Sequence, residues 1–517
     1  MITQSATTVA SLTLRALSRY PDRIAFRTGD RALTYAATLD LIGRFQRVLS
    51  NAGVGSGARI ALLSANRADS WCAGVAAQSL GAAVTSLHPM GSLEAHIGQI
   101  TDAEVAVLVV DSANYLIRGG ELAAAFADVK TLTLGAAEYG ANLLALAQDS
   151  GSATARDQSS PIDMATLNYT GGTTGKSKGV MRSSAAIAHM ALTVVAEFEL
   201  PPAPRFLAVA PISHVAGTNV LPTLLRGGTV HLLEKFDPDN LLAIIAREKI
   251  NFTLMVPTMI YTVLDHPRLG EHDLSSLELL LYGASPMSPT RLMEGLERIG
   301  PVFSQLYGQT ECYPIAVLRK EDHDPKWPKL FEACGFPTAA SEVRLLDDND
   351  AEVAQGAPGE ICVRSPIVMT GYWKQPDLTA EATTGGWLHT GDIAVADDVG
   401  RLFIVDRKKD MIVSGGFNVY PREVEDVLTA HKDVAQAAVI GIPDAKWGEA
   451  VAAYVVLKDG TTPTQQELKQ LVRDRKGSVL APKQIEFVAA LPLTPLGKID
   501  KKALRSSHWA AGSRNVG

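Results

Sequence analysis

The sequence predicts an α/β protein in which a mostly parallel sheet covered by helices is followed by a small C-terminal α+β domain. Three observations lead to this class. The chain has 517 residues, too many for one core when a domain usually holds roughly 100–200 residues. Short apolar runs alternate with longer helical patterns, which is the rhythm of β-α-β units. A charged run at residues 406–410 then separates this rhythm from a final segment of strand and helix patterns.

The N-terminal elements can be assigned in chain order. Residues 1–23 have the apolar spacing of an amphipathic helix and lack the features of a signal peptide. Residues 58–63 predict a strand, residues 71–80 a helix and residues 81–87 the next strand. Residues 103–110, AEVAVLVV, are mostly apolar and predict a strand buried on both faces.

The C-terminal elements begin with a tight turn at residues 397–401, followed by an apolar strand at 402–405. Pro421 starts a helix, and residues 437–442 and 450–457 predict strands.

The charged run Asp406–Asp410 marks the domain boundary. We place a hinge there, although a charged surface turn fits the same residues. The expected division is an N-terminal domain of residues 1–406, a hinge at 407–409 with Lys409 as its pivot, and a C-terminal domain of residues 410–517.

Composition excludes several classes of protein. With 46% hydrophobic and 20% charged residues, the chain resembles globular proteins and not disordered ones. The net charge of -7 does not give the positive electrostatic field that a general nucleic-acid-binding protein uses to attract phosphates. No run of about 18 apolar residues occurs, so we expect no membrane-spanning helix. Four cysteines without a C-x-x-C pair argue against a zinc or redox motif and favour a reducing compartment, the cytoplasm.

Residues 169–180, YTGGTTGKSKGV, form the most informative segment. Its glycines let backbone N–H groups face a ligand, its threonines add hydroxyl groups and its lysines add positive charge, as in a loop that wraps a polyphosphate. A Walker loop is excluded, because counting back from Gly175 across four residues reaches Thr170 where glycine is required. A flexible surface loop has a similar composition, so this segment alone leaves both interpretations open.

Four further segments stand beside residues 169–180, namely residues 307–311 (YGQTE), 387–392 (WLHTGD), 406–410 (DRKKD) and 492–498 (PLTPLGK). In chain order, the five segments resemble the phosphate loop, nucleotide motif, ribose motif, hinge and catalytic-lysine motif of the adenylate-forming superfamily. This family includes acyl- and aryl-CoA synthetases, firefly-type luciferases and the adenylation domains of peptide synthetases. The resemblance spans nearly the whole chain. It implies a large N-terminal multi-layer α/β domain plus a small, mobile C-terminal α+β domain that closes over it in two orientations.

The resemblance also implies a reaction: ATP activates a carboxylic acid as an acyl-adenylate, and the acyl group passes to the thiol of coenzyme A. ATP, Mg²⁺ and coenzyme A are the implied ligands. Because the first transition state spreads negative charge over phosphate oxygens, the protein must supply positive charge and aimed hydrogen-bond donors.

Roles at the nucleotide follow from the resemblance. Lys498 is expected to bridge the substrate carboxylate and the α-phosphate, which Thr310 also contacts. Glu311 is expected to bind Mg²⁺, because one carboxylate suffices where phosphates supply other ligands. Asp392 should accept hydrogen bonds from the ribose, which Arg407 also reaches. The residues implied at the β- and γ-phosphates are Thr170, Gly171, Gly172, Thr173, Thr174, Gly175 and Lys176. Gly283, Ala284 and Ser285 are implied beside adenine and the acyl pocket. Tyr307 is expected to stack on adenine, and Gly308 follows it in the same motif.

For the acid and the thiol, the resemblance implies three further residues. His214 lies where the family has an aromatic residue or histidine beside the substrate carboxylate, with a role in positioning and gating; a lone histidine is otherwise a structural residue. Gly415 and Gly416 match the loop that lines the pantetheine tunnel.

The acyl pocket is expected between residues 215–219, 283–285 and 313–316. These residues are small or apolar and include no lysine or arginine. An unpaired charge would be costly there, so the pocket predicts a hydrophobic monocarboxylate. A medium or long fatty acid is favoured, and a cinnamate- or benzoate-like acid is the alternative.

Three other functions share some of these features: a luciferase-like oxygenase, an adenylation enzyme that loads a carrier protein, and a non-catalytic nucleotide-binding scaffold. The scaffold is disfavoured because the lysine, the Mg²⁺ ligand and the phosphate loop are all present. An attached carrier is disfavoured because the sequence ends soon after Lys498, but a free-standing loader stays open. The expected partners are therefore a small-molecule carboxylic acid, ATP and coenzyme A, without nucleic acid. The oligomeric state stays open, with a homodimer as one option.

Overall fold

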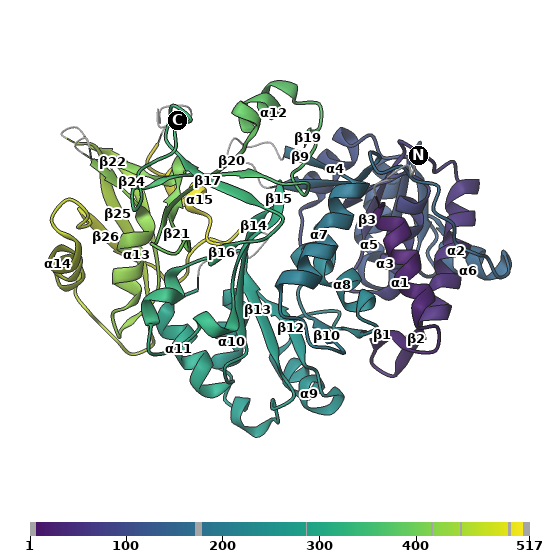
Figure 1. Cartoon of the computed structure of the whole chain (residues 1–517), viewed down its shortest axis with the longest axis horizontal. Coiled ribbons are helices and arrows are strands. Elements are labelled where there is room, and N and C mark those ends of the chain that lie inside the picture. Colours follow the sequence, from purple (N-terminus) through teal and green to yellow (C-terminus); the bar gives the residue numbers. More distant parts are fainter. Residues whose placement is uncertain are drawn as a thin grey trace.

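The computed structural model of the chain describes residues 7–170, 178–285, 287–414, 417–444, 447–494 and 498–509. The N-terminal part contains two large sheets, and two smaller sheets follow in the chain (Figure 1). We refer to the four as sheets A to D. A large α/β domain and a small C-terminal domain are thus present, as the sequence predicts.

Sheet A has the strand order β16-β15-β14-β13-β12-β10-β11-β1-β2. The pairs that join β1, β11, β10, β12, β13 and β14 are parallel, and antiparallel strands close both edges. The strands are β1 (Ile24–Thr28), β2 (Arg31–Thr34), β10 (Arg205–Ala208), β11 (Thr229–Leu232), β12 (Phe252–Met255), β13 (Leu279–Gly283), β14 (Phe303–Gln309), β15 (Cys312–Leu318) and β16 (Phe336–Pro337).

Sheet B has the order β19-β9-β8-β4-β3-β5-β6-β7 and is parallel from β8 to β7. Its strands are β3 (Arg59–Leu63), β4 (Ala83–Ser86), β5 (Val107–Val110), β6 (Lys130–Thr133), β7 (Ala141–Asn142), β8 (Met164–Thr170), β9 (Lys178–Ser183) and β19 (Gly371–Tyr372). The predicted parallel, helix-covered sheet is confirmed in both sheets.

Helices lie between the two sheets and outside them. The main core contains residues of both sheets and of the helices α1 (Val9–Arg19), α2 (Tyr35–Asn51), α3 (Ala68–Ser79), α7 (Ser184–Glu197) and α8 (Val220–Leu225). A second core joins sheet A to α9 (Pro238–Glu248), α10 (Pro257–Leu264) and α11 (Pro289–Arg298). A third joins sheet B to α4 (Leu93–Asp102) and α5 (Ser112–Ala125). This five-layer arrangement buries both faces of each parallel sheet.

The remaining elements belong to the smaller sheets or cover the surface. Sheet C is antiparallel and contains β17 (Glu342–Leu346), β18 (Gly359–Arg364), β20 (Leu388–Ala396) and β21 (Leu402–Arg407). Sheet D contains β22 (Ile412–Ser414), β23 (Phe417–Val419), β24 (Val434–Asp444), β25 (Gly448–Leu457) and β26 (Gln484–Phe487). The other helices are α6 (Leu143–Asp149), α12 (Pro376–Ala382), α13 (Pro421–Thr429), α14 (Gln465–Lys476) and α15 (Lys501–Ser506).

The predicted hinge lies between sheets C and D. Strand β21 of sheet C ends at Arg407, a short 3₁₀ turn covers Lys408–Asp410, and β22 of sheet D begins at Ile412. Sheet D has its own apolar core with α13 and α14. The domain division at residues 406 to 410 stays a prediction, which this arrangement supports.

One predicted strand was too long. Only Val107–Val110 form β5, whereas α4 ends at Asp102 and Glu104 has a φ of 49°. This left-handed residue turns the chain between helix and strand. The apolar residues Ala103 and Val105 are buried in this turn, which explains why their pattern resembled a buried strand. Among the described residues, no helix has the length and apolar character needed to cross a bilayer.

Candidate active site

A buried carboxylate of sheet C lies at the centre of the candidate site. Strands β20 and β21 pair Asp392 with Arg407, and Arg407 Nε lies 3.1 Å from Asp392 Oδ1. The hydroxyl of Tyr307, on β14 of sheet A, donates to Asp392 Oδ2 at 2.7 Å. Asp392 is 4% exposed. One oxygen of Asp392 therefore accepts a hydrogen bond and the other pairs with a cation. A carboxylate held in this way can also accept hydrogen bonds from a pair of ribose hydroxyls.

The local backbone explains how Asp392 is held. Gly391 has a φ of 71°, a conformation that glycine adopts without strain. The Asp392 N–H donates to Thr390 Oγ1 at 3.1 Å, and the Thr390 hydroxyl donates to the Ile361 carbonyl. The Asp392 charge raises the pKa of Arg407, so this guanidinium stays a cation. Burial, followed by Asp392, raises the pKa of Tyr307, so its hydroxyl stays a donor.

Lys498 is brought to this carboxylate from the far end of the chain. Its carbonyl accepts from Thr494 N–H at 2.7 Å, and its own N–H donates to Thr494 Oγ1 at 3.2 Å. The next helix, α15, is fixed by ion pairs of 2.8 Å that join Lys501 to Glu425 and Arg505 to Asp410. Burial, followed by the Arg407 charge, lowers the pKa of Lys498 to about 8, while Asp392 acts in the opposite direction.

The lowered pKa of Lys498 predicts a pH dependence. A lysine is a cation below its pKa, so a reaction that needs this charge proceeds below pH about 8 and is lost above it. For pyrophosphate release, kcat/KM for ATP should fall about tenfold per pH unit on the alkaline side. The variant Lys498→Arg, if active, should lack this limb because arginine stays charged. An unchanged alkaline limb in Lys498→Arg would assign the titration to another group.

Glu311 lies in the turn that joins β14 to β15. The hydroxyl of Tyr372, on β19, donates to Glu311 Oε1 at 2.9 Å. Lys178 Nζ lies 5.1 Å from the centre of the Tyr372 ring. Thr170 and Lys178, which bracket the glycine-threonine loop, are partners in the β8–β9 pair. The base of the predicted phosphate loop and the predicted Mg²⁺ ligand are therefore brought together through Tyr372.

A buried arginine acts on the same carboxylate. Arg182, on β9, is 8% exposed and donates to Thr166 Oγ1 at 3.2 Å. Burial lowers its pKa to about 10, and the Glu311 charge acts in the opposite direction. Arg182 therefore stays charged at neutral pH and places a buried positive charge near Glu311. A single carboxylate suits a divalent cation that phosphate oxygens also bind.

The segment predicted beside adenine follows β13. Gly283 pairs with Leu306 of β14, and a Cβ atom at Gly283 would lie 2.4 Å from the Leu306 carbonyl oxygen. Glycine is therefore required for these strands to approach. Ala284 has a φ of 66°, in the left-handed region that alanine rarely adopts. Ser285 follows, and Gly308 and Thr310 lie at the carboxyl end of the neighbouring β14, so these residues belong to the same edge of sheet A, and their place beside adenine stays a prediction.

His214 lies at the carboxyl end of another strand of sheet A, β10. Its Nδ1 lies 2.8 Å from Ser213 Oγ, and its ring centre lies 4.5 Å from that of His88, which follows β4 of sheet B. Burial, followed by His88, lowers the pKa of His214 to about 3, so its ring is neutral near pH 7. A neutral imidazole agrees with positioning and not with a charge role.

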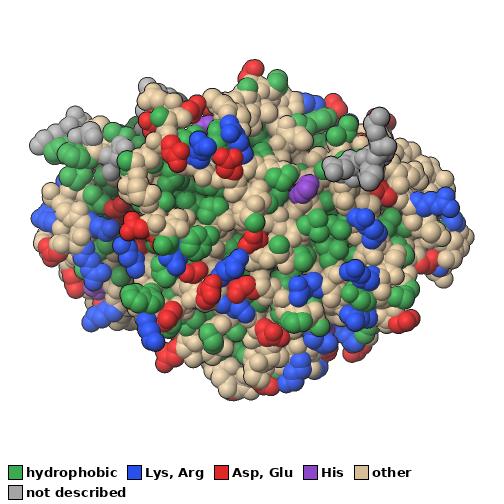
Figure 2. All heavy atoms as spheres, viewed as in Figure 1, with side chains coloured by type: hydrophobic (Ala, Val, Ile, Leu, Met, Phe, Trp, Pro, Cys, Tyr) green, Lys and Arg blue, Asp and Glu red, His purple; other side chains and the backbone are tan. Residues whose placement is uncertain are grey.

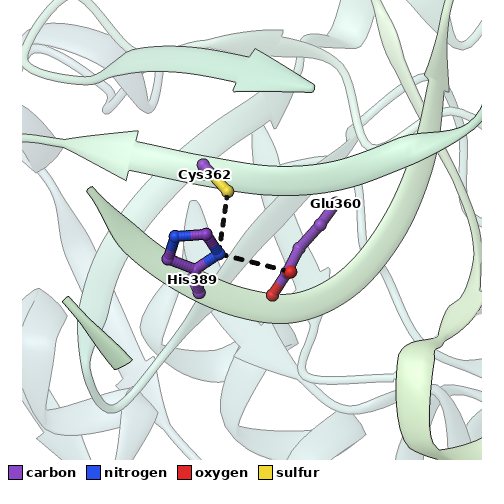
Figure 3. A group of neighbouring side chains, drawn as sticks. All are labelled: Glu360, Cys362 and His389. Carbon is purple, nitrogen blue, oxygen red and sulfur yellow. Dashed lines mark hydrogen bonds and ion pairs between the residues drawn. The ribbon is translucent and has the colours of Figure 1, made fainter. Parts of the chain in front are cut away.

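A polar cluster links the ribose strand to the hinge. Glu360, Cys362 and His389 lie together on β18 and β20 (Figure 3). Glu360 Oε1 accepts from Gly391 N–H at 2.8 Å, and its Oε2 lies 3.3 Å from His389 Nδ1. Although such a group can hold a metal ion, a cation already contacts it, because Lys408 Nζ lies 3.4 Å from Glu360 Oε2. Glu360 thus joins Lys408 of the predicted hinge to the turn before Asp392.

Some predicted residues lie outside the described residues: Gly171, Gly172, Thr173, Thr174, Gly175, Lys176, Gly415 and Gly416. Lys409 is in the 3₁₀ turn of the hinge. Sequence reasoning missed three residues that contact residues of the predicted site or motifs, namely His88, Glu360 and Tyr372. It also missed Arg182, whose charge interacts with that of Glu311. No local pattern marks them, because each contact joins segments far apart in the chain.

These features define an adenylate-forming enzyme, with a large α/β domain and a small α+β domain that contribute to one polar site. The chain belongs to the AMP-binding enzyme family, which it matches over residues 14–373, and it matches the AMP-binding enzyme C-terminal domain over residues 423–498.

Individual relatives agree with this assignment. The chain is 42% identical to a medium/long-chain-fatty-acid–CoA ligase, FadD8, of Mycobacterium tuberculosis, over 99% of this chain and 92% of the relative. It is 36% identical to a feruloyl-CoA synthase of Amycolatopsis sp., over 96% and 98% of the two chains. Among solved structures, the amide bond synthetase McbA of Marinactinospora thermotolerans superposes with a TM-score of 0.90 at 35% identity, covering 96% of this chain and 99% of its own.

Proposed function

We propose that the chain is an AMP-forming acyl-CoA ligase that activates a hydrophobic carboxylic acid. In the first step, a carboxylate oxygen of the acid attacks the α-phosphorus of ATP, and the bond to pyrophosphate breaks. In the second step, the thiol of coenzyme A attacks the acyl carbon, and AMP leaves with the electron pair of the broken bond.

The convergence of Lys498, Arg407 and Asp392 carries this proposal. Asp392 is buried, whereas Lys498 is partly buried and the Arg407 side chain is 46% exposed. Two cations and a carboxylate from separate segments have no reason to lie together in this way unless a ligand or a structural pair requires them. Asp392 and Arg407 form such a pair, but Lys498 adds an ammonium whose pKa is lowered at a cost in free energy. A cation held there is suited to the charge that develops between a carboxylate and the α-phosphate.

The residues around Glu311 fit the Mg²⁺ that the family implies. The Tyr372 hydroxyl donates to Oε1 of this carboxylate, and Arg182 places a positive charge near it. A single carboxylate with phosphate oxygens and water is a normal Mg²⁺ environment. Bound there, Mg²⁺ would neutralise the phosphate charge that develops as pyrophosphate leaves. Glu311 would hold it, and Lys178 and Thr170 would meet the same phosphates.

The acid is expected to be a medium or long fatty acid. Ala216, Ile315 and Ala316 are buried where the acyl pocket is predicted, and each CH₂ buried against such residues adds about 0.8 kcal/mol, a factor of roughly four. We therefore expect kcat/KM to rise along the series from acetate to octanoate and beyond. Pyrophosphate release across a panel of acids, measured with and without coenzyme A, tests this order.

The same panel separates the alternatives. Best activity on acetate, malonate or an amino acid would contradict the hydrophobic pocket. Best activity on a cinnamate- or benzoate-like acid would support an aryl-CoA ligase, which the similarity to a feruloyl-CoA synthase favours as the second candidate. Pyrophosphate release with coenzyme A present but without acyl-CoA formation would show that coenzyme A is not the acceptor. A carrier protein, or the amine that the similarity to an amide bond synthetase suggests, would then be tested in its place.

A further inference from the structure

His88 and His214 meet across the two large sheets. His88 follows β4 of sheet B, and His214 follows β10 of sheet A. Their ring centres are 4.5 Å apart at an interplanar angle of 71°, an edge-to-face arrangement. Ligands of parallel α/β folds bind beside the carboxyl ends of strands. The two rings therefore lie where both sheets border the crevice expected to receive a ligand.

The loop that carries His88 is fixed by hydrogen bonds. The Met90 N–H donates to His88 Nδ1 at 3.1 Å, which leaves the proton of the neutral ring on Nε2. The His88 carbonyl accepts from His96 Nε2 at 2.9 Å, and His96 is 1% exposed. Arg118 Nη1 donates to the Gly91 carbonyl at 2.8 Å. The contacts of the His88 and Gly91 carbonyls fix this loop independently of His214 and of the nitrogens of the His88 ring.

The His214 ring has less support of its own. It precedes the 3₁₀ helix Val215–Asn219, with φ and ψ of -126° and -147°, and its side chain bonds to the neighbouring Ser213. A residue at such a chain turn can reorient its ring more easily than one inside a helix. His88 supplies a firm surface against one side of this ring.

We propose that His88 is a positioning residue for the acid, acting through His214, a role that rests on the function proposed above. The His88 ring holds the His214 ring in the orientation that orders the substrate carboxylate before it attacks ATP. The contact between the rings carries the effect, so an aromatic ring without the imidazole nitrogens should serve.

The test measures acid-dependent pyrophosphate release. In His88→Ala, KM for the acid should rise by about 5–10-fold, the size of an aromatic pair contact, with a smaller change in kcat. His88→Phe should restore most of the wild-type KM. Met90→Ala is the matched control, because Met90 lies on the same loop with an exposed side chain (69%), and it should behave as wild type.

A double-variant cycle with His214→Ala tests whether His88 acts through His214. If it does, His88→Ala should add little to the loss already caused by His214→Ala. Additive losses, a failure of His88→Phe to restore KM, or a wild-type KM in His88→Ala would each overturn the proposal. If the wild-type enzyme is active and His88→Ala has a wild-type KM for the acid, only this inference is refuted. If the wild-type enzyme releases no pyrophosphate with any acid, the proposed function is refuted.

Discussion

Lys498→Ala should lose acyl-adenylate formation by about 10²–10³-fold, the usual cost of removing one preorganised group that stabilises transition-state charge. The ammonium lies near Arg407 and Asp392 in the present orientation of the C-terminal domain. It is expected to contact the acid and the α-phosphate only there. Thioester formation from a preformed acyl-adenylate should therefore stay close to the wild-type rate.

The two half-reactions must be measured separately to see this difference. Pyrophosphate exchange into ATP reports the first step, and acyl-CoA formation from synthetic acyl-adenylate reports the second. Lys502→Ala is the matched control, since this exposed lysine belongs to the same charged run and should leave both rates unchanged. Equal losses of both rates in Lys498→Ala would show that Lys498 has a structural role or serves both steps.

Much of this site could be predicted because motif residues and their spacing are local properties of the chain. Arg407 and Asp392 lie on adjacent strands of a hairpin whose turn, residues 397–401, is evident from its Asp and Gly residues. Their pairing thus follows from a short-range pattern. Only the family resemblance predicted that Lys498 lies near Arg407 and Asp392. Nothing in the sequence around Lys498 indicates which distant strand it approaches.

The contacts that the sequence did not predict join residues far apart in the chain. Whether such residues touch depends on the geometry of their side chains in the folded protein. His88 and Tyr372 have no sequence pattern that distinguishes them from structural residues, and each meets its partner from a different part of the chain. The error at residues 103–106 has a related cause. Apolar residues are buried in strands and in tight turns alike, and only the backbone at Glu104 distinguishes the two.

The mixed distribution of surface charge agrees with small-molecule substrates. Figure 2 shows acidic and basic side chains interspersed over the visible face, without a field of one sign. Long-range steering of a polyanion is therefore not a feature of this face. Among the described residues, we expect ATP binding to depend on local cations such as Lys178, Arg407 and Lys498.

The predicted hinge at residues 407–409 would let one enzyme carry out both steps. Helix α13 contacts β21 through Arg422, whose N–H donates to Asp406 Oδ2 at 2.9 Å and whose Nη1 donates to the Ile404 carbonyl at 3.1 Å. These bonds join the C-terminal domain to the strand that precedes the hinge. A rotation about Lys409 would break them, so they stabilise the orientation in which Lys498 is near Asp392.

Lys409→Pro should spare adenylate formation and reduce thioester formation by about 10²-fold, the cost of misplaced reacting groups. Lys409 lies in a 3₁₀ turn, for which φ is near the value of about -65° that proline fixes. Proline thus suits the present orientation and opposes the large change in φ that a second orientation requires. Lys409→Ala removes the same side chain while leaving φ free, so it should retain both half-reactions. If both steps run at wild-type rates in Lys409→Pro, the pivot lies elsewhere. If Lys409→Pro and Lys409→Ala lose the same amount of activity, the effect belongs to the side chain and not to the backbone.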